Sequence, residues 1–346
     1  MSVSFKVNNF DLIRLFAAVQ VALIHIVTHL KIEQLYNLVA ILKYFPGVPV
    51  FFVVSGFLIS KSWQVSPSFS TYFRNRALRI FPALWVCLII SVCIFIAAGV
   101  RPASFKEFSI WLIAQISIGQ FYNPDFLRGF GVGVINGSLW TIPVELQFYF
   151  VLPFIYLACK DKLYRWIIFV IVAMALLFSS RYFISDKHTT IQKLLSVSLV
   201  PYIFYFIVGI VARHIFELRP NIFANTLHYY LGLYVLSILL HKYFHIGGIT
   251  GNYLNVVQII LLGLLTVSAA YSLPSISDKL LAKNDISYGL YIYHMPIVNV
   301  LIFLGFKGVS SGILAIFAAV VMSFLSWRLI ERPALHMKKN ALILDR

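Results

Sequence analysis

The sequence is poor in charged residues, in cysteine and in the glycine-rich motifs that bind phosphates. Only 12% of its 346 residues are charged, and its three cysteines are Cys87, Cys93 and Cys159. Cys87 and Cys93 are too far apart on one helix to be bridged, and no Cys-x-x-Cys pair occurs, so we expect inert packing residues. We also expect no metal. Because no Walker loop or GxGxxG fingerprint stands between a strand and a helix, a phosphate ligand would have to be held by side chains.

Long apolar runs are what the sequence has in abundance. Hydrophobic residues make up 60% of the chain, and runs of about 20 residues, the length that crosses a bilayer, recur throughout. We therefore predict an all-α, polytopic membrane bundle of about ten transmembrane helices, with residues 1–346 as a single domain. The first run lacks a small-residue cleavage site, so we expect a retained helix. The predicted spans are 10–30, 44–60, 80–99, 138–157, 164–183, 195–214, 227–244, 254–273, 286–304 and 311–330.

Basic residues set the predicted orientation of this bundle. With the N-terminus inside, most of the 28 lysines and arginines fall on the cytoplasmic side, so both termini are predicted to be cytoplasmic. We attribute the formal net charge of +16 to topology and to anionic lipid or phosphate, and we expect no nucleic acid partner. The apolar stretch 108–122 is short for a span, so residues 100–137 are placed in an outer loop with a re-entrant or interfacial segment.

The first predicted span carries a polar stripe. Arg14 and His25 are eleven residues apart, which is three helical turns plus about 20°, so they share a face about 16 Å apart along the axis. Asp11 and His29 extend the stripe. An uncompensated charge in lipid costs at least a few kcal/mol, so this face is predicted to line the bundle interior or a water-filled cavity. Taken singly, Arg14 could be a snorkelling positive-inside residue and His25 an interhelical hydrogen bonder.

A basic cluster lies in the segment YFRNRALRIFPALW. Arg74, Arg76 and Arg79 crowd the predicted cytoplasmic edge, and Pro82 is expected in the first turn of the following helix. Arg76 and Arg79 are spaced i, i+3, which puts two guanidinium groups on one side of a helix start and suits bidentate contact with phosphates. The alternative is that the cluster only sets topology.

Span 138–157 contains an intramembrane carboxylate. Ser138, Glu145 and Tyr149 fall within about 60° of one another on a helix, and Pro143 and Pro153 can kink it and free backbone groups for a cavity. The structural alternative for Glu145 is a salt bridge to a basic neighbour such as Arg14.

Two other spans carry small or polar groups. Ser55 and Gly56 lie in the middle of the second span, where small residues by themselves indicate close helix packing. Ser287, Tyr291 and His294 share a face of the ninth span. His294, which precedes Met-Pro, has the alternative of a structural hydrogen bonder near the outer surface.

The chain resembles acyltransferase family 3 of integral membrane proteins in motifs that occur in order: RLFAAVQVALIH, FFVVSGFLI, RNRALRIFPALW, GSLWTIPVELQFYFVLP, SYGLYIYH and a terminal ERP. This family includes bacterial O-acetyltransferases acting on O-antigen and other surface glycans. The resemblance implies a bundle in the inner (plasma) membrane that moves an acyl group from cytoplasmic acyl-CoA, with acetyl-CoA as the commonest donor, to a glycan or lipid-linked glycan outside. Some members carry an additional SGNH hydrolase-like domain. This chain ends about 16 residues after its last predicted span, so we expect the bundle alone to perform the reaction.

The resemblance also assigns roles, because the family's residues fall on Arg14, His25, Ser55, Gly56, Arg76, Arg79, Trp140 and Glu145. We predict catalytic roles for His25, Arg14 and Glu145. The donor would be bound by Arg76, Arg79 and Arg74. The predicted substrate-binding residues are Ser55, Gly56, Trp140, Tyr149, Tyr291 and His294.

The predicted reaction explains why the first span would carry a polar stripe. A sugar hydroxyl attacks a thioester readily only when a base takes its proton, and an imidazole with a pKa of about 6.5 is suited to this. We predict that His25, near the bilayer midplane, is that base; an acyl-histidine intermediate is equally compatible. Arg14 would add charge complementarity, and Glu145 would either orient His25 or contact the acceptor.

Two other function classes share some of these features. A transporter of a small polar solute or lipid-linked sugar would also place such residues beside broken helices, but it more often shows paired repeats, which we do not find. A glycosyltransferase that uses a lipid-linked sugar would more often show acidic metal ligands in a loop. Acyl transfer is therefore the prediction, and transport is the alternative.

Overall fold

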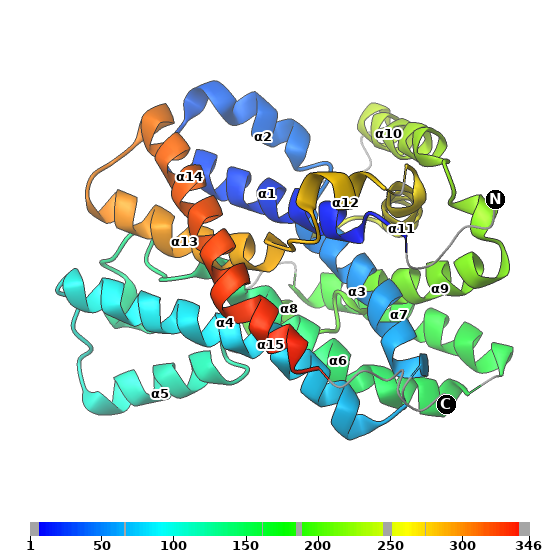
Figure 1. Cartoon of the computed structure of the whole chain (residues 1–346), viewed down its shortest axis with the longest axis horizontal. Helices are drawn as coiled ribbons and strands as arrows, with labels where there is room; N and C mark the ends of the chain where they lie inside the picture. Colours follow the sequence, from blue (N-terminus) through cyan, green and yellow to red (C-terminus); the bar gives the residue numbers. More distant parts are fainter. Residues whose placement is uncertain are drawn as a thin grey trace. The chain divides into compact units, whose positions relative to one another are not determined.

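The computed structural model describes residues 7–65, 67–160, 162–184, 189–244, 251–273 and 275–338. Every regular element within these ranges is a helix, which confirms the all-α prediction (Figure 1). The α-helices are α1 (Phe10–His29), α2 (Tyr36–Leu42), α3 (Gly47–Val65), α4 (Phe69–Ala97), α5 (Phe105–Ile116), α6 (Thr141–Cys159), α7 (Leu163–Ile184), α8 (Thr190–Ser196), α9 (Ile203–Leu218), α10 (Leu227–Tyr243), α11 (Val256–Tyr271), α12 (Ile276–Leu281), α13 (Ser287–Phe303), α14 (Gly308–Ser326) and α15 (Arg332–His336). The 3₁₀ segments are η1 (Glu33–Leu35), η2 (Asp125–Leu127), η3 (Gly137–Trp140) and η4 (Pro220–Ile222), and η5 (Trp327–Glu331) is a π-helix.

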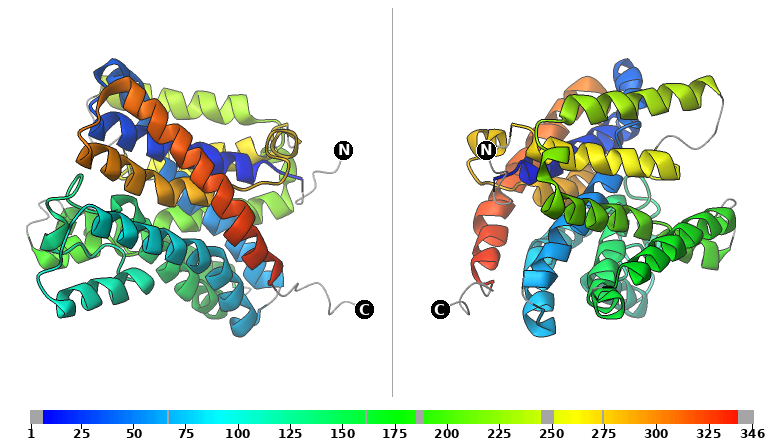
Figure 2. Two further views of the ribbon diagram at one scale, coloured as in Figure 1. Left: turned by 60° about the vertical axis from the view of Figure 1, so that its left-hand side comes forward. Right: turned by 90° about the vertical axis from the view of Figure 1, so that its right-hand side faces the viewer.

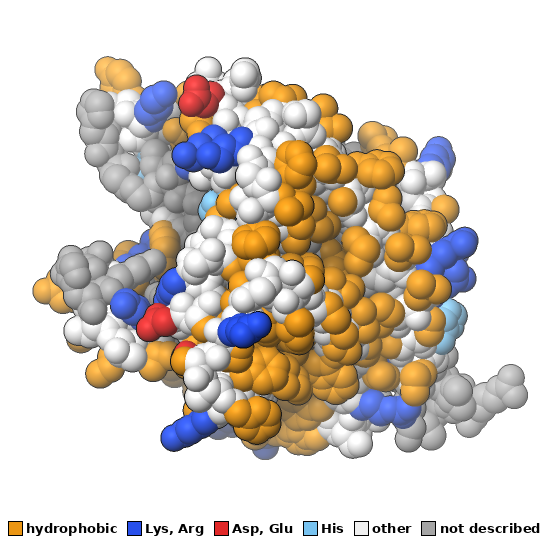
Figure 3. Space-filling view, turned by 90° about the vertical axis from the view of Figure 1, so that its left-hand side faces the viewer, with side chains coloured by type: hydrophobic (Ala, Val, Ile, Leu, Met, Phe, Trp, Pro, Cys, Tyr) orange, Lys and Arg blue, Asp and Glu red, His pale blue; other side chains and the backbone are white. Residues whose placement is uncertain are grey.

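The helices have the length and surface of a multi-pass membrane protein. Within the described residues, six helical stretches are long and apolar enough to cross a membrane: Phe10–His29, Glu33–Val65, Phe69–Ala97, Gly137–Cys159, Leu163–Ile184 and Gly308–His336. Two shorter apolar helices are Val256–Tyr271 and Ser287–Phe303. Hydrophobic side chains cover most of the face drawn in Figure 3, and exposed apolar area on this scale suits contact with lipid. The count of ten spans and their orientation stay predictions.

The predicted span 195–214 is wrong. In the structure α8 ends at Ser196 and α9 begins at Ile203, so turns occupy the positions between them. Pro201 is the physical reason, because it has no N–H to donate and disfavours a helical conformation of the residue before it. The α-helix that replaces the span is therefore α9, which runs on to Leu218.

Two predicted helix starts also need correction. The helix α4 begins at Phe69, so the arginine cluster lies within it and Pro82 lies in its interior, not in a first turn. No Pro or Gly interrupts the sequence from Phe69 to Phe81, which lets the helix extend upstream. Conversely, Ser138 belongs to the 3₁₀ segment η3, so it does not share an α-helical face with Glu145. Pro143 lies in the first turn of α6, where its missing N–H needs no partner and it causes no kink.

The chain forms two compact units, and the first consists of residues 1–17, 43–69 and 147–284 in their described parts. Its centre is the packing of α3 against α9 (Figure 1). A Cβ on Gly56 would lie 2.0 Å from the carbonyl oxygen of Phe206, and a Cβ on Gly209 would lie 2.2 Å from that of Val53. Two backbones approach this closely only where side chains are missing, so Gly56 has the packing function that small residues indicate. In the same unit α10 lies beside α11 (Figure 2).

The second unit consists of residues 18–42, 70–146 and 285–346 in their described parts. Here α13 packs against α14, where a Cβ on Gly289 would lie 2.9 Å from the Cα of Ser323. The short helix α5 packs on α4 through Trp111 and Phe95, whose ring centroids are 5.6 Å apart. Its twelve residues rise only about 18 Å, too little to cross a bilayer. This length agrees with the re-entrant or interfacial segment expected between 100 and 137.

Replacement of Gly56 by Ala is expected to destabilise the first unit, because the backbones of α3 and α9 would have to move apart. Overpacking of this kind typically lowers stability by about 1–3 kcal/mol. The measurement is the thermal unfolding midpoint of the detergent-solubilised variant, followed by tryptophan fluorescence.

The matched control is Gly232→Ala on α10, where a Cβ would meet no atom within 4 Å. This variant should be as stable as the parent or slightly more so, since Ala has the higher helix propensity. Equal unfolding midpoints for both variants would contradict the close approach of α3 to α9.

Candidate functional site

The most distinctive polar contact of the second unit joins two histidines. His25 lies near the end of α1 and His294 lies in α13, and His25 Nδ1 is 2.9 Å from His294 Nε2. The two rings are nearly parallel, with centroids 5.2 Å apart and planes inclined by 20°. His294 is fully buried, and the ring of His29 lies 5.8 Å from that of His25. Two residues that the sequence placed in separate predicted roles are therefore in direct contact.

A proline explains the polar residues that surround the middle of α13. Pro296 has no N–H, so the carbonyl of Ile292, four residues earlier, lacks its intrahelical partner. Asn136 Nδ2 donates to that carbonyl at 2.7 Å, and the Cys87 thiol donates to it at 3.3 Å. Cys87 is thus more than the inert packing residue we expected. A buried carbonyl that would be unsatisfied in lipid is satisfied from two other segments.

Tyr291 lies on α13 one turn before His294, and hydrogen bonds hold its hydroxyl in place. Its hydroxyl donates to the carbonyl of Ser138 at 2.7 Å and lies 2.7 Å from Thr141 Oγ1. The hydroxyl of Ser138 in turn donates to Asn136 Oδ1. These bonds fix η3 and the start of α6 against α13. The substrate-binding role of Tyr291 stays a prediction, and its observed contacts are structural.

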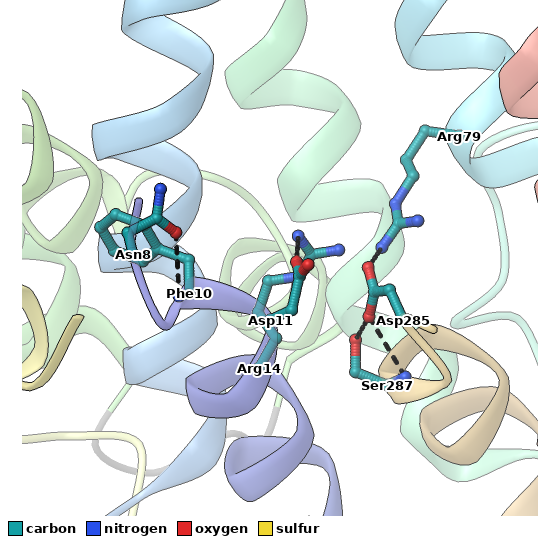
Figure 4. A network of polar contacts seen from close by, with 7 residues as sticks. All are labelled: Asn8, Phe10, Asp11, Arg14, Arg79, Asp285 and Ser287. Atoms are coloured by element: carbon teal, nitrogen blue, oxygen red, sulfur yellow. Dashed lines mark hydrogen bonds and ion pairs between the residues drawn. The ribbon is translucent and has the colours of Figure 1, made fainter. Parts of the chain in front are cut away.

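The arginine cluster is tied to the beginning of α13. Arg79 Nη2 lies 2.5 Å from Asp285 Oδ2, and the other carboxylate oxygen of Asp285 accepts from the hydroxyl of Ser287 at 2.5 Å (Figure 4). Asp285 is buried, so this is a largely desolvated ion pair. Arg74 is exposed and donates to the carbonyl of Met337, whereas Arg76 is half-buried. Arg79 therefore links α4 to the residues that precede α13. This structural role does not depend on whether Arg79 also binds acyl-CoA.

Arg14 lies on α1, as the sequence predicts, and belongs to the first unit. Its Nη1 is 3.3 Å from Asp11 Oδ1, one turn earlier on the helix (Figure 4). The charge of Arg14 is thus partly compensated within α1 itself. This local pair explains how the helix can carry a guanidinium in an apolar sequence.

The remaining predicted site residues are distributed over both units. Glu145 is half-buried on α6 in the second unit, and Tyr149 is buried on the same helix in the first. Trp140 ends η3, and Ser55 and Gly56 lie in α3. The position beside His25 Nδ1, where we considered Glu145 as an orienting group, is held by His294.

Sequence reasoning missed three polar residues of this region: Asn136, Thr141 and Asp285. Asp285 carried a local signal, because it stands directly before the predicted span 286–304 and Asp is a typical residue at that place. The other two act by bonding to α13 across the fold. Among the described residues no group of three or more His, Cys, Asp and Glu side chains is arranged to hold a metal ion.

Comparison with known families now decides the class of protein. The model of an acyltransferase domain, the acyltransferase 3 family, matches residues 7–331. The chain belongs to this acyltransferase family. It is accordingly an O-acyltransferase, and the resemblance seen in the sequence motifs is confirmed.

Three curated proteins illustrate what the chain is similar to. Nodulation protein 10 of Rhizobium leguminosarum bv. viciae is 31% identical over 96% of this chain and 94% of its own length. The O-acetyl transferase of Shigella phage Sf6 is 30% identical over 86% of this chain and 87% of its own length. Peptidoglycan O-acetyltransferase OatA of Listeria monocytogenes is 24% identical over 86% of this chain, which spans about half of that protein (52%). No solved structure matches the chain.

Replacement of Asp285 by Asn is expected to destabilise the second unit, because it keeps the size of the side chain but leaves the charge of Arg79 without its buried counter-ion. Breaking a buried pair from one side lowers stability by about 3 kcal/mol. The measurement is the free energy of unfolding in mixed micelles.

Asp278→Asn is the matched control, since Asp278 is exposed on α12 and undergoes the same chemical change. It should leave the free energy of unfolding within about 0.5 kcal/mol of the parent value. Equal stability of the Asp285 and Asp278 variants would show that the ion pair does not hold α4 to α13.

Proposed function

We propose that the protein transfers an acyl group, acetyl in the first instance, from acyl-CoA to a hydroxyl of a surface or extracytoplasmic glycan. Membership of the acyltransferase family supports the reaction class, and the names of the Shigella phage and Listeria relatives support acetyl as the group and a glycan as the acceptor. The apolar helices support a location in the bilayer. We assign the protein to the inner (plasma) membrane, with about ten spans and both termini cytoplasmic.

One observation carries the mechanism: the imidazole of His25 on α1 is hydrogen-bonded to that of His294. A sugar hydroxyl is a weak nucleophile, and general-base catalysis by a positioned imidazole typically contributes about 10²- to 10⁴-fold to such a step. His25 is a base on a helix that is long enough to cross the membrane. A base there could serve a donor that arrives from one side and an acceptor that arrives from the other.

In the proposed step, the proton of the acceptor hydroxyl moves to the imidazole of His25 while the hydroxyl oxygen attacks the thioester carbonyl carbon. The tetrahedral intermediate then collapses, and the carbon–sulfur bond breaks. The imidazolium returns its proton to the leaving thiolate, so the products are the glycan ester and free CoA. Arg14 would stabilise negative charge along this path, and Glu145 would contact the acceptor.

The donor phosphates are assigned to Arg76 and Arg79, with Arg74 at the exposed edge. The fork of a guanidinium suits bidentate contact with a phosphate. The ion pair with Asp285 would hold the side chain of Arg79 in position. Ser55, Gly56, Trp140 and Tyr149 remain predicted contacts of the acceptor.

The variants His25→Ala and His25→Gln test this function. Both should insert into the membrane, but transfer of labelled acetyl from acetyl-CoA to glycan in membrane vesicles should fall by at least about 10²-fold. Gln retains hydrogen-bonding groups but cannot act as a base near neutral pH. Ala and Gln should therefore be comparably inactive.

His228→Gln provides the matched control, because His228 is exposed on α10. It should retain the parent rate at equal membrane abundance. An active His25→Gln variant would overturn His25 as the base and return it to the role of an interhelical hydrogen bonder.

A further inference from the structure

The hydrogen bonds of His294 fix which of its ring nitrogens carries the proton. His294 Nδ1 lies 3.1 Å from the carbonyl oxygen of Leu290, one turn earlier on α13. A carbonyl oxygen only accepts hydrogen bonds, so Nδ1 must be the N–H donor. In the neutral imidazole the other nitrogen, Nε2, then holds a lone pair. Burial among apolar helices favours this neutral form, because a cation is expensive there.

The tautomer of His294 also determines the tautomer of His25. The lone pair of His294 Nε2 faces His25 Nδ1 at 2.9 Å, so His25 Nδ1 must be the donor of that bond. The neutral ring of His25 consequently carries its proton on Nδ1 and its lone pair on Nε2. The chain of donors runs in one direction, from His25 to His294 to the carbonyl of Leu290.

We propose that His294 is a positioning residue that fixes the tautomer of His25 and thereby makes His25 Nε2 the nitrogen that takes the acceptor's proton. This inference rests on the proposed function, in which His25 is the base. It replaces substrate binding as the role of His294. The partner of a histidine nitrogen determines the tautomer and ring orientation of a catalytic histidine in the same way in hydrolase triads and metal sites.

The surroundings of His294 suit a group that must not move. Its ring is fully buried and nearly parallel to that of His25, with centroids 5.2 Å apart, as an in-plane hydrogen bond between the two rings requires. The neighbouring turn of α13 is held by Tyr291 through Ser138 and Thr141, and by Asn136 through the carbonyl of Ile292. When His25 takes up a proton, its Nδ1–H becomes a stronger donor to a nitrogen that is already in place. The added charge is thus met by a fixed acceptor, so little rearrangement is needed during the reaction.

Two substitutions that differ by one methylene separate positioning from a purely structural role. In His294→Gln, the side-chain oxygen reaches the place of Nε2 and can accept from His25. In His294→Asn, the side-chain amide reaches the place of Nδ1, so the bond to Leu290 is kept but His25 loses its acceptor. If His294 has only a structural role in α13, the His294→Asn variant should be the more active of the two. If His294 positions His25, the His294→Gln variant should be the more active.

We expect His294→Gln to retain kcat for acetyl transfer within about tenfold, and His294→Asn to lose kcat by about 10²-fold, within the range that a general base supplies. The KM for acetyl-CoA should be unchanged in both variants, since the proposed role of His294 involves no contact with the acyl donor. Equal kcat values for the Asn and Gln variants, or a loss expressed in KM, would overturn the proposal.

A second measurement reports the tautomer without turnover. In protein labelled with ¹⁵N-histidine, the resonances of His25 are identified by their disappearance in His25→Gln. Near neutral pH the parent protein should show a protonated Nδ1 and an unprotonated Nε2 at His25, and the His294→Asn variant should show a mixture of tautomers. A protonated Nε2 in the parent protein would overturn the proposal.

Different results would refute the acyl-transfer function and the positioning role of His294. Absence of acetyl transfer by the parent protein would refute the proposed function and leave the tautomer assignment open to the NMR measurement. Inactive His25 variants combined with a fully active His294→Asn variant would retain the function and refute the positioning role of His294.

Discussion

A polar group that lies in a bilayer has no water to bind, so the protein itself must satisfy it. This constraint explains the buried polar contacts around the middle of α13 in the second unit. Pro296 frees the carbonyl of Ile292, and Asn136 and Cys87 satisfy it. Asn299 is fully buried and bonds to the backbone at Val132, Val134 and Ile135, which holds the loop that precedes η3. The buried polar residues of α13 therefore have protein partners, and His294 is one of them.

The same constraint separates groups that can be neutral from groups that cannot. Two imidazoles can form the contact between His25 and His294 while both are neutral, so this pair needs no counter-ion among apolar helices. Arginine keeps its charge under all relevant conditions, and both Arg14 and Arg79 have a carboxylate beside them. A neutral base that becomes charged only during the reaction suits proton transfer in this setting better than a permanently charged group.

The sequence predicted what depends on periodicity and failed where the outcome depends on packing. The stripe of Arg14 and His25 on one helix followed from eleven-residue spacing, and the all-α class followed from the apolar runs. The break before α9 was missed because the predicted span rested on hydropathy alone, which takes no account of the missing N–H of Pro201. The contact between His25 and His294 joins residues 269 positions apart, and no local pattern encodes which face of α1 meets α13. Asp285 was given no role, because nothing in the sequence near it points to its partner Arg79, 206 positions away.

The proposed function requires that this membrane protein places acyl groups on an extracytoplasmic glycan. Mass spectrometry of surface polysaccharide, prepared from otherwise identical cells with and without the gene, tests it most directly. We expect glycan from cells with the gene to carry additional mass corresponding to ester-linked acetyl groups, which mild alkali removes. Glycans of identical mass in the two preparations, with the protein present in the membrane, would contradict it.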